Sequence, residues 1–282
     1  MPDTVEEVLA WHPHWDIWAA LIFLGVAYWY LGARIGPLVA PAGTNPMPRR
    51  KALQFYGGLA LLWLVTDWPI HDIGEGALFS FHMLEHLVMA LVAAPLLLIG
   101  TPTWMARYLL DRPAILSVLK PLARPVPALV IFNVALVGLH WPVIIESMIT
   151  NPLSHFAVHA VLFSSALLAW MPVLSPLPEV PELGRPGQML YLFVNSLMPT
   201  VPASFLVFGN TPLYQIYAEA PRVFGWSPML DQGLAGILMK LGGGAILWGT
   251  ITVIWFRWYR EQREWDSLEA ELRSGSASSP SS

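Results

Sequence analysis

Hydrophobic residues gather in long segments along the whole chain, with short polar links between them. A helix needs about 20 such residues to cross about 30 Å of hydrocarbon. Seven segments reach or approach this length, at residues 15–34, 52–68, 79–100, 126–146, 154–175, 187–208 and 233–256. Pro199 and Pro202 each remove a helix hydrogen bond from the sixth segment and are expected to bend it. The pattern predicts an all-α, polytopic membrane helix bundle of about seven spans, with six or eight as the alternatives.

The composition supports a membrane protein and excludes several other classes. Of the 282 residues, 55% are hydrophobic and 12% are charged, whereas a soluble domain carries about 25% charged residues. The net charge of −4 leaves no basic surface for nucleic acid. Because the chain has no cysteine, it cannot form a disulfide, a thiolate metal site or a c-type haem attachment. A bound metal would need His, Met, Asp, Glu or backbone ligands.

Basic residues fall in alternate links, and this predicts the orientation of the bundle. The links after the first and third segments and the C-terminal segment carry Arg34, Arg49, Arg50, Lys51, Arg107, Arg112, Lys120, Arg124, Arg257, Arg260, Arg263 and Arg273. Because Lys and Arg in short loops stay on the cytoplasmic side, we expect the N-terminus outside and the C-terminus inside. Residues 1–257 then form a single transmembrane domain, 258–273 a cytoplasmic amphipathic tail and 274–282 a disordered end.

The positions of Lys and Arg alone predict this topology, and with it all the histidines fall on the outer side. They are His12, His14, His71, His82, His86, His140, His155 and His159. His82 and His86 are four positions apart and therefore share one helix face, together with Glu85 and Met89. Polar groups inside a membrane usually turn inward to a partner. This face therefore offers two imidazoles, a carboxylate and a thioether to the bundle interior.

Two further helices offer imidazoles at a similar depth. His155 and His159 repeat the four-residue spacing near the outer end of the fifth segment, and His140 lies near the outer end of the fourth. Neutral imidazole is the commonest transition-metal ligand, and nitrogen and thioether donors suit copper, with zinc also compatible. We expect a metal site among these residues, with a structural or proton-relay network as the alternative. His12, His14 and His71 lie in links, where a solvated role is expected.

The seventh segment contributes polar residues of a different kind. Asp231 is placed to cap this helix, and Gln232 follows it on one face. Lys240 is nine residues from Asp231, about 13 Å further along the axis and half a turn out of phase. We therefore expect Lys240 to pair with Glu85 on another helix or to extend toward the membrane surface. These three residues are predicted to support the site rather than to bind the ion.

Several motifs together resemble the CtaG family of caa-type cytochrome c oxidase assembly factors. They are SFHMLEHLVMALVAAPLLLIGTP at 80–102, HWP at 140–142, HFAVH at 155–159, PLY at 212–214 and LDQGLAGILMK at 230–240, within a likeness that covers about residues 14–257. The resemblance implies a seven-span membrane protein that handles copper for a haem-copper oxidase. Glu85 departs from the family pattern, which often has Gln there. A cysteine-bearing copper chaperone that shares the family label is excluded, because this chain has no cysteine.

The residues and the resemblance together favour a non-enzymatic, copper-binding assembly factor in a bacterial plasma membrane. In this interpretation His82, His86, His155 and His159 bind copper, as Cu(I) or Cu(II), and His140 is a further or transfer ligand. Glu85 could add a carboxylate. Met83 or Met89 could add a soft donor, and Met89 is the better placed by helical phase. The expected partners are oxidase subunits, a copper donor on the outer side and the lipid bilayer, with self-association of the chain left open.

Three other functions remain open at this level. Histidines on two different helices could hold a haem for electron transfer, since one helix cannot supply both faces. Residues 82–86 match the HxxEH spacing of some zinc hydrolases, with Glu85 as a general base. Glu85 and Lys240 could instead line a transport pathway.

Overall fold

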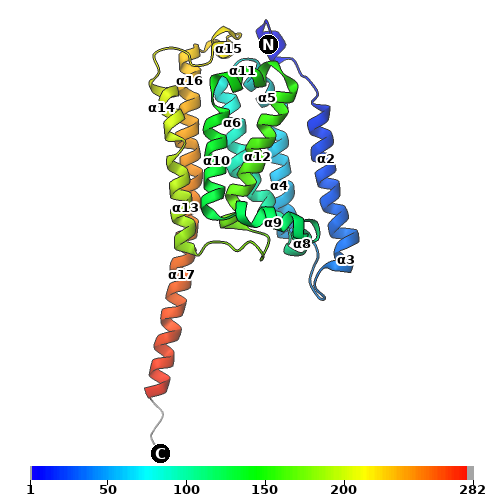
Figure 1. Ribbon diagram of the computed structural model, residues 1–282, viewed down its shortest axis with the longest axis vertical. Coiled ribbons are helices and arrows are strands. Elements are labelled where there is room, and N and C mark those ends of the chain that lie inside the picture. The colour runs from blue at the N-terminus through cyan, green and yellow to red at the C-terminus, as the bar shows by residue number, and fades with distance from the viewer. Residues whose placement is uncertain (1, 278–282) are drawn as a thin grey trace, which may run out of the picture.

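The computed structural model describes residues 2–277, which form helices and connecting segments with no strand among them. The longer helices are α2 (Trp15–Tyr30), α4 (Arg49–Val65), α6 (Phe79–Val88), α7 (Ala94–Gly100), α10 (Pro125–Leu139), α12 (Pro152–Leu174), α13 (Arg185–Leu197), α14 (Thr200–Phe208), α16 (Pro228–Ile237) and α17 (Gly243–Ala277). Most run along the long axis of the molecule and pack side by side (Figure 1). The predicted all-α class is confirmed for the described residues.

Within residues 2–277, five helical segments are long and apolar enough to cross a membrane. They are Trp15–Val39, Phe79–Gly100, Pro152–Leu174, Arg185–Phe208 and Pro228–Glu269. A sixth follows if α9 (Pro113–Leu122) and α10, which meet at 78°, count as one broken span. The second predicted span corresponds to α4, which has 17 residues and reaches only about 26 Å at 1.5 Å per residue. The structure thus supports five or six spans, and the count of seven remains a prediction.

Three of the long segments contain a π-helical turn: η1 (Leu31–Ile35), η2 (Met89–Ala93) and η4 (Leu238–Gly242). The first two turns directly precede Pro37 and Pro95. A proline has no backbone N–H and its ring collides with the carbonyl four residues earlier, so the helix widens locally to continue. The turn η2 follows the end of α6, so the helical period of the segment carrying the HMLEH motif does not continue into the rest of the span.

Short helices close one end of the bundle. α5 (Ile70–Gly76), α11 (Pro142–Thr150) and α15 (Gln215–Glu219) lie at the end drawn uppermost in Figure 1, together with the N-terminal segment that holds α1 (Val5–Leu9). At the opposite end are α3 (Gly36–Val39), α8 (Thr103–Leu110) and α9. The predicted tail at 258–273 is the continuing end of α17, which projects beyond the bundle. Of the end predicted to be disordered, 274–277 also continue α17, and 278–282 lie outside the described residues.

The helix α12 packs against η2, α7, α10 and α11 and takes part in two interhelical hydrogen bonds. Trp170 Nε1 donates to Ala90 O at 2.9 Å, and Tyr191 Oη of α13 donates to Ala169 O at 2.8 Å. Each bond satisfies an aromatic polar group at a backbone carbonyl inside an apolar core, where an unpaired group would be costly. These contacts hold α12 in one position against the segment that begins with α6.

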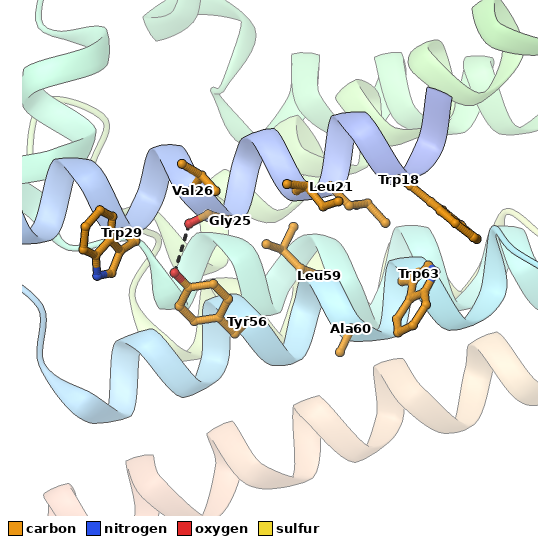
Figure 2. Close-up of a pocket in the computed structure, with 10 residues that line it drawn as sticks. Trp18, Leu21, Gly25, Val26, Trp29, Tyr56, Leu59, Ala60 and Trp63 are labelled. Carbon is orange, nitrogen blue, oxygen red and sulfur yellow. Dashed lines mark hydrogen bonds between the residues drawn. The ribbon is translucent and has the colours of Figure 1, made fainter. Parts of the chain in front are cut away.

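The helix α2 lies at the edge of the bundle and packs against α4 (Figure 1). Between them lies an apolar groove of about 650 Å³, shown in Figure 2. It is lined by Trp18, Leu21, Ile22, Gly25, Val26, Trp29, Tyr56, Leu59, Ala60 and Trp63. Tyr56 Oη donates to Gly25 O at 2.9 Å across the groove. Many apolar side chains of α2 remain exposed, including Ile22 and Phe23, as expected for a helix that faces lipid.

Candidate metal centre

The N-terminus of α6 is fixed by a carboxylate from the far end of the chain. Asp231 of α16 accepts hydrogen bonds from the backbone N–H groups of Phe79 at 2.7 Å and Ser80 at 3.0 Å, and from Ser80 Oγ at 2.5 Å. The prediction that Asp231 caps its own helix is wrong, because Ser227 Oγ does so by accepting from Leu230 N at 3.2 Å. Asp231 therefore satisfies free N–H groups on the helix that presents His82 and His86.

The helix α12 begins with a cap of its own. Asn151 Oδ1 accepts from the backbone N–H groups of Leu153 at 2.9 Å and Ser154 at 3.3 Å. The helix thus starts at Pro152, and His155 and His159 lie in its first two turns. Both pairs of histidines spaced four apart therefore lie near helix N-termini at the same end of the bundle. The two pairs were predicted from the sequence to lie at a similar depth, and their positions agree with this.

His82, His86 and His159, here called the inner triad, turn toward one another. One ring nitrogen from each lies within 4.8 Å of the other two. The ring centroids of His82 and His86 are 4.0 Å apart, and those of His86 and His159 are 5.1 Å apart. His82 is fully buried and His86 is 6% exposed. Metal–nitrogen bonds are about 2.0 Å long, so small side-chain rotations would bring all three nitrogens onto one ion.

The inner triad contains buried nitrogens that lack hydrogen-bond partners. Both ring nitrogens of His82, both of His86 and Nε2 of His159 are buried, and none has a partner among the described residues. Leaving one buried polar group unpaired costs about 1–3 kcal/mol. Side chains that served only to tie helices together would be expected to find partners. The three imidazoles thus have nitrogens free for another partner, and such a group could hold a transition-metal ion.

Glu85 is fully buried beside the inner triad and contacts two histidines. Its carboxylate oxygens lie 3.0 and 3.1 Å from His71 Nδ1 and 3.4 Å from His159 Nδ1. A carboxylate at Nδ1 holds the imidazole in the tautomer that leaves Nε2 free for a metal. The predicted pairing of Glu85 with Lys240 is wrong. Lys240 Nζ instead donates to Ser196 O at 3.2 Å and to Thr200 Oγ1 at 2.6 Å.

His140 lies next to the inner triad but is not part of it. Its ring centroid is 6.4 Å from that of His86, its Nδ1 contacts Leu136 O at 2.5 Å, and its Nε2 lies 3.2 Å from Met83 Sδ. Met83 is thus the thioether at the histidines. Met89 packs in the apolar cluster around α4, although it was the better placed by regular helical phase. The N–H of Met89 bonds to Glu85 O, so Met89 keeps the α-helical phase, but it lies nearly one turn beyond His86, where it packs against α4.

A second group, here called the outer triad, consists of His71, Glu75 and His155. One donor atom from each lies within 4.8 Å of the other two. His71 was predicted to be solvated in a link, and this is wrong, because α5 folds onto α6 and leaves His71 only 4% exposed. The close approach occurs at Gly74, where a Cβ would lie 2.9 Å from His82 N. The four-residue spacing of His71 and Glu75 was the available signal in the sequence.

Charged neighbours and burial shift the pKa values of the ionisable side chains on and next to α5. Burial lowers the pKa of His71, but the carboxylates of Glu85 and Glu75 outweigh it and raise the pKa to about 10. Burial raises the pKa of Glu75 to about 7 against the opposing pull of His71. His14 Nε2 lies 3.1 Å from Asp72 Oδ2, and this hydrogen bond raises the pKa of His14. His12 Nδ1 lies 3.3 Å from Asp72 Oδ1, with its side chain 57% exposed.

The remaining predicted residue, Gln232, joins α16 to the segment before it. Gln232 Oε1 accepts from Leu213 N at 2.6 Å, and Gln232 Nε2 donates to Leu206 O at 3.2 Å. In the same segment, Tyr214 Oη donates to His140 O at 2.9 Å and Tyr217 Oη donates to Gly74 O at 2.8 Å. The segment thereby ties α16 to the backbone on both sides of the histidines. Gln232, like Asp231, is a positioning residue.

Comparison with known proteins yields one family. The family model described as cytochrome c oxidase caa3 assembly factor (Caa3_CtaG) matches residues 25–261. None of the curated proteins and none of the solved structures matches the chain. The matched range contains every residue of both triads and covers most of the chain.

Proposed function

Since the chain belongs to the family of cytochrome c oxidase caa3 assembly factors, we propose that it supplies copper to a haem-copper oxidase through the inner triad. Copper is the cargo of this protein rather than a permanent cofactor. The role needs a site that binds the ion and releases it to an oxidase subunit, and no catalytic step. His82, His86 and His159 are the proposed ligands.

The observation that carries this proposal is the set of unpartnered imidazole nitrogens in the inner triad. Three neutral imidazoles bind Cu(I) or Cu(II) well, and copper(II) forms the strongest complexes among divalent first-row ions. With three protein ligands, a fourth position stays open for exchange. His140 and Met83 lie beside the triad, with His140 Nε2 3.2 Å from Met83 Sδ. They offer a further imidazole and a thioether along the path of release.

The distribution of charge supports an outer-facing site in a bacterial plasma membrane. The basic residues of the links near α3, α8 and α9 lie at the end of the bundle opposite the histidines (Figure 1). By the preference of Lys and Arg for the cytoplasm, the histidines then face the outside, and α17 ends in the cytoplasm. Copper would arrive from a donor on the outer side, where the oxidase subunit would also accept it.

The geometry does not favour the other functions considered. A haem would need axial histidines from two helices, and the ring centroids of His86 in α6 and His159 in α12 are only 5.1 Å apart, which leaves no room for a porphyrin between them. Glu85 is engaged by His71 and His159, which occupies the carboxylate that a hydrolase would use as a base. Lys240 bonds to Ser196 and Thr200 and leaves the Glu85–Lys240 pathway without its second member.

The test compares the purified wild-type chain with a His86→Ala/His159→Ala variant. Both are loaded with copper, washed and analysed by metal mass spectrometry, and oxidase activity is measured in cells that express either chain. The matched control, His12→Ala/His14→Ala, removes the same number of imidazoles outside both triads. We expect loss of triad-bound copper and of oxidase activity in the first variant alone. Unchanged copper content in that variant would overturn the proposal.

A further inference from the structure

The outer triad brings three donor atoms together around Glu75 Oε1. Glu75 Oε1 lies 2.6 Å from His155 Nδ1 and 3.5 Å from His71 Nε2. Yet this oxygen is buried and has no hydrogen bond of acceptable geometry among the described residues. Two imidazole nitrogens thus face one buried carboxylate oxygen, and these three atoms form a donor set that one ion could share. The donor set of two nitrogens and one oxygen suits Cu(II) and Zn(II).

The outer triad is the more exposed of the two, because Glu75 and His155 are partly exposed, whereas in the inner triad only His159 is. An open pocket of about 180 Å³ reaches Glu75 from the end of the bundle covered by the N-terminal segment, and its lining includes Glu7, His12 and Asp72. Its acidic lining would attract cations. By contrast, His82 and Glu85 are fully buried. An ion that reaches the inner triad from this end would therefore meet the outer triad first.

The two triads are in contact with each other. The rings of His155 and His159 stack at 4.5 Å between centroids, and both belong to α12. Glu85 contacts Nδ1 of His71 in the outer triad and Nδ1 of His159 in the inner triad. Ligand orientation in both groups therefore depends on one carboxylate. The distance between the triads is short enough for an ion to exchange ligands one at a time.

We propose that His71, Glu75 and His155 form a second metal site, which receives a divalent first-row ion from the outside water and passes it to the inner triad. Binding of the ion releases any proton on the ligand nitrogens to water, and the transfer then exchanges ligands and leaves the charge of the ion unchanged. The receiving role rests on the proposed function, because it needs the inner triad as acceptor. The existence of the site does not, since its ligands and its pocket are its own.

The experiment loads purified protein with Cu(II) and measures both the amount bound and the rate of binding. The variant Glu75→Gln keeps the shape of the side chain and removes its charge, and Glu146→Gln, an exposed carboxylate on α11, is the matched control. We expect about two ions per wild-type chain and about one in Glu75→Gln. That remaining ion also shows that the variant is folded. Its loading should be about tenfold slower than in wild type, as expected for loss of a receiving ligand.

The two proposals fail in different ways. If Glu75→Gln binds as much copper as wild type at the same rate, while His86→Ala/His159→Ala loses an ion, the outer site is overturned and the proposed function stands. If His86→Ala/His159→Ala keeps full copper content, the proposed function is overturned. A second outer variant, His155→Asn, should reproduce the loss seen with Glu75→Gln, and full copper content in both would also overturn the outer site.

Discussion

Ser80 and Asp231 are 151 positions apart in the sequence and share two hydrogen bonds, one from the Ser80 N–H and one from its hydroxyl. They join α16 to the first turn of α6, which carries His82 and His86. The positions of the two histidines therefore depend on a residue of the last long segment. Conversely, a change in α16 can act on the inner triad without contacting it.

Replacing Asp231 with alanine should destabilise the protein by about 1–2 kcal/mol, because α6 loses the acceptor for its first N–H groups. Copper affinity should fall in the same variant, because the first turn of α6 loosens. The control is Ser227→Ala, which removes the cap of α16 and leaves α6 untouched. Thermal unfolding in detergent and copper titration test this. Equal copper affinity in Asp231→Ala and Ser227→Ala would contradict it.

Replacing Glu85 with leucine should weaken copper binding about 10- to 100-fold, the usual effect of losing a residue that orients metal ligands. His71 and His159 would both lose the acceptor at Nδ1. Glu85→Gln should weaken binding less, because its amide oxygen still accepts one hydrogen bond. Competition with a chelator of known affinity measures both. The prediction fails if the leucine variant competes as well as wild type.

Replacing Lys240 with methionine should leave copper affinity unchanged, because the ammonium group bonds to Ser196 and Thr200 rather than to Glu85. Methionine keeps the length of the side chain and removes the charge. Copper titration of Lys240→Met beside Glu85→Leu separates the two roles. A loss of affinity comparable to that of Glu85→Leu would show that Lys240 acts on the metal centre.

The His14–Asp72 pair should make stability depend on pH. The pKa of folded His14 is raised above 6.5, so its contribution is complete below the pKa of the unfolded chain and is lost as the pH rises through the folded value. The difference in melting temperature between wild type and His14→Gln should therefore shrink as the pH increases from about 5 to about 9. A difference that stays constant across this range would rule out the pair as its source.

Most helices and both histidine pairs are predictable from the order of residues along the chain. Helical periodicity is local, so the four-residue spacing of His82 with His86 and of His155 with His159 already places each pair on one face. The family resemblance, carried by the same motifs, is confirmed by the match over residues 25–261. The positions of the prolines are also visible in the sequence. The π-helical turn before Pro95, however, does not follow from the regular period of an α-helix.

Which side chains meet depends on how the helices pack. His71 lies between two of the predicted spans, yet it is buried because α5 packs on α6 at Gly74. Asp231 caps a helix far away in the chain, and Lys240 finds Ser196 and Thr200 instead of Glu85. The physical reason is that buried polar groups must find partners wherever packing brings them. That packing joins segments far apart in sequence, and spacing along one helix cannot specify it.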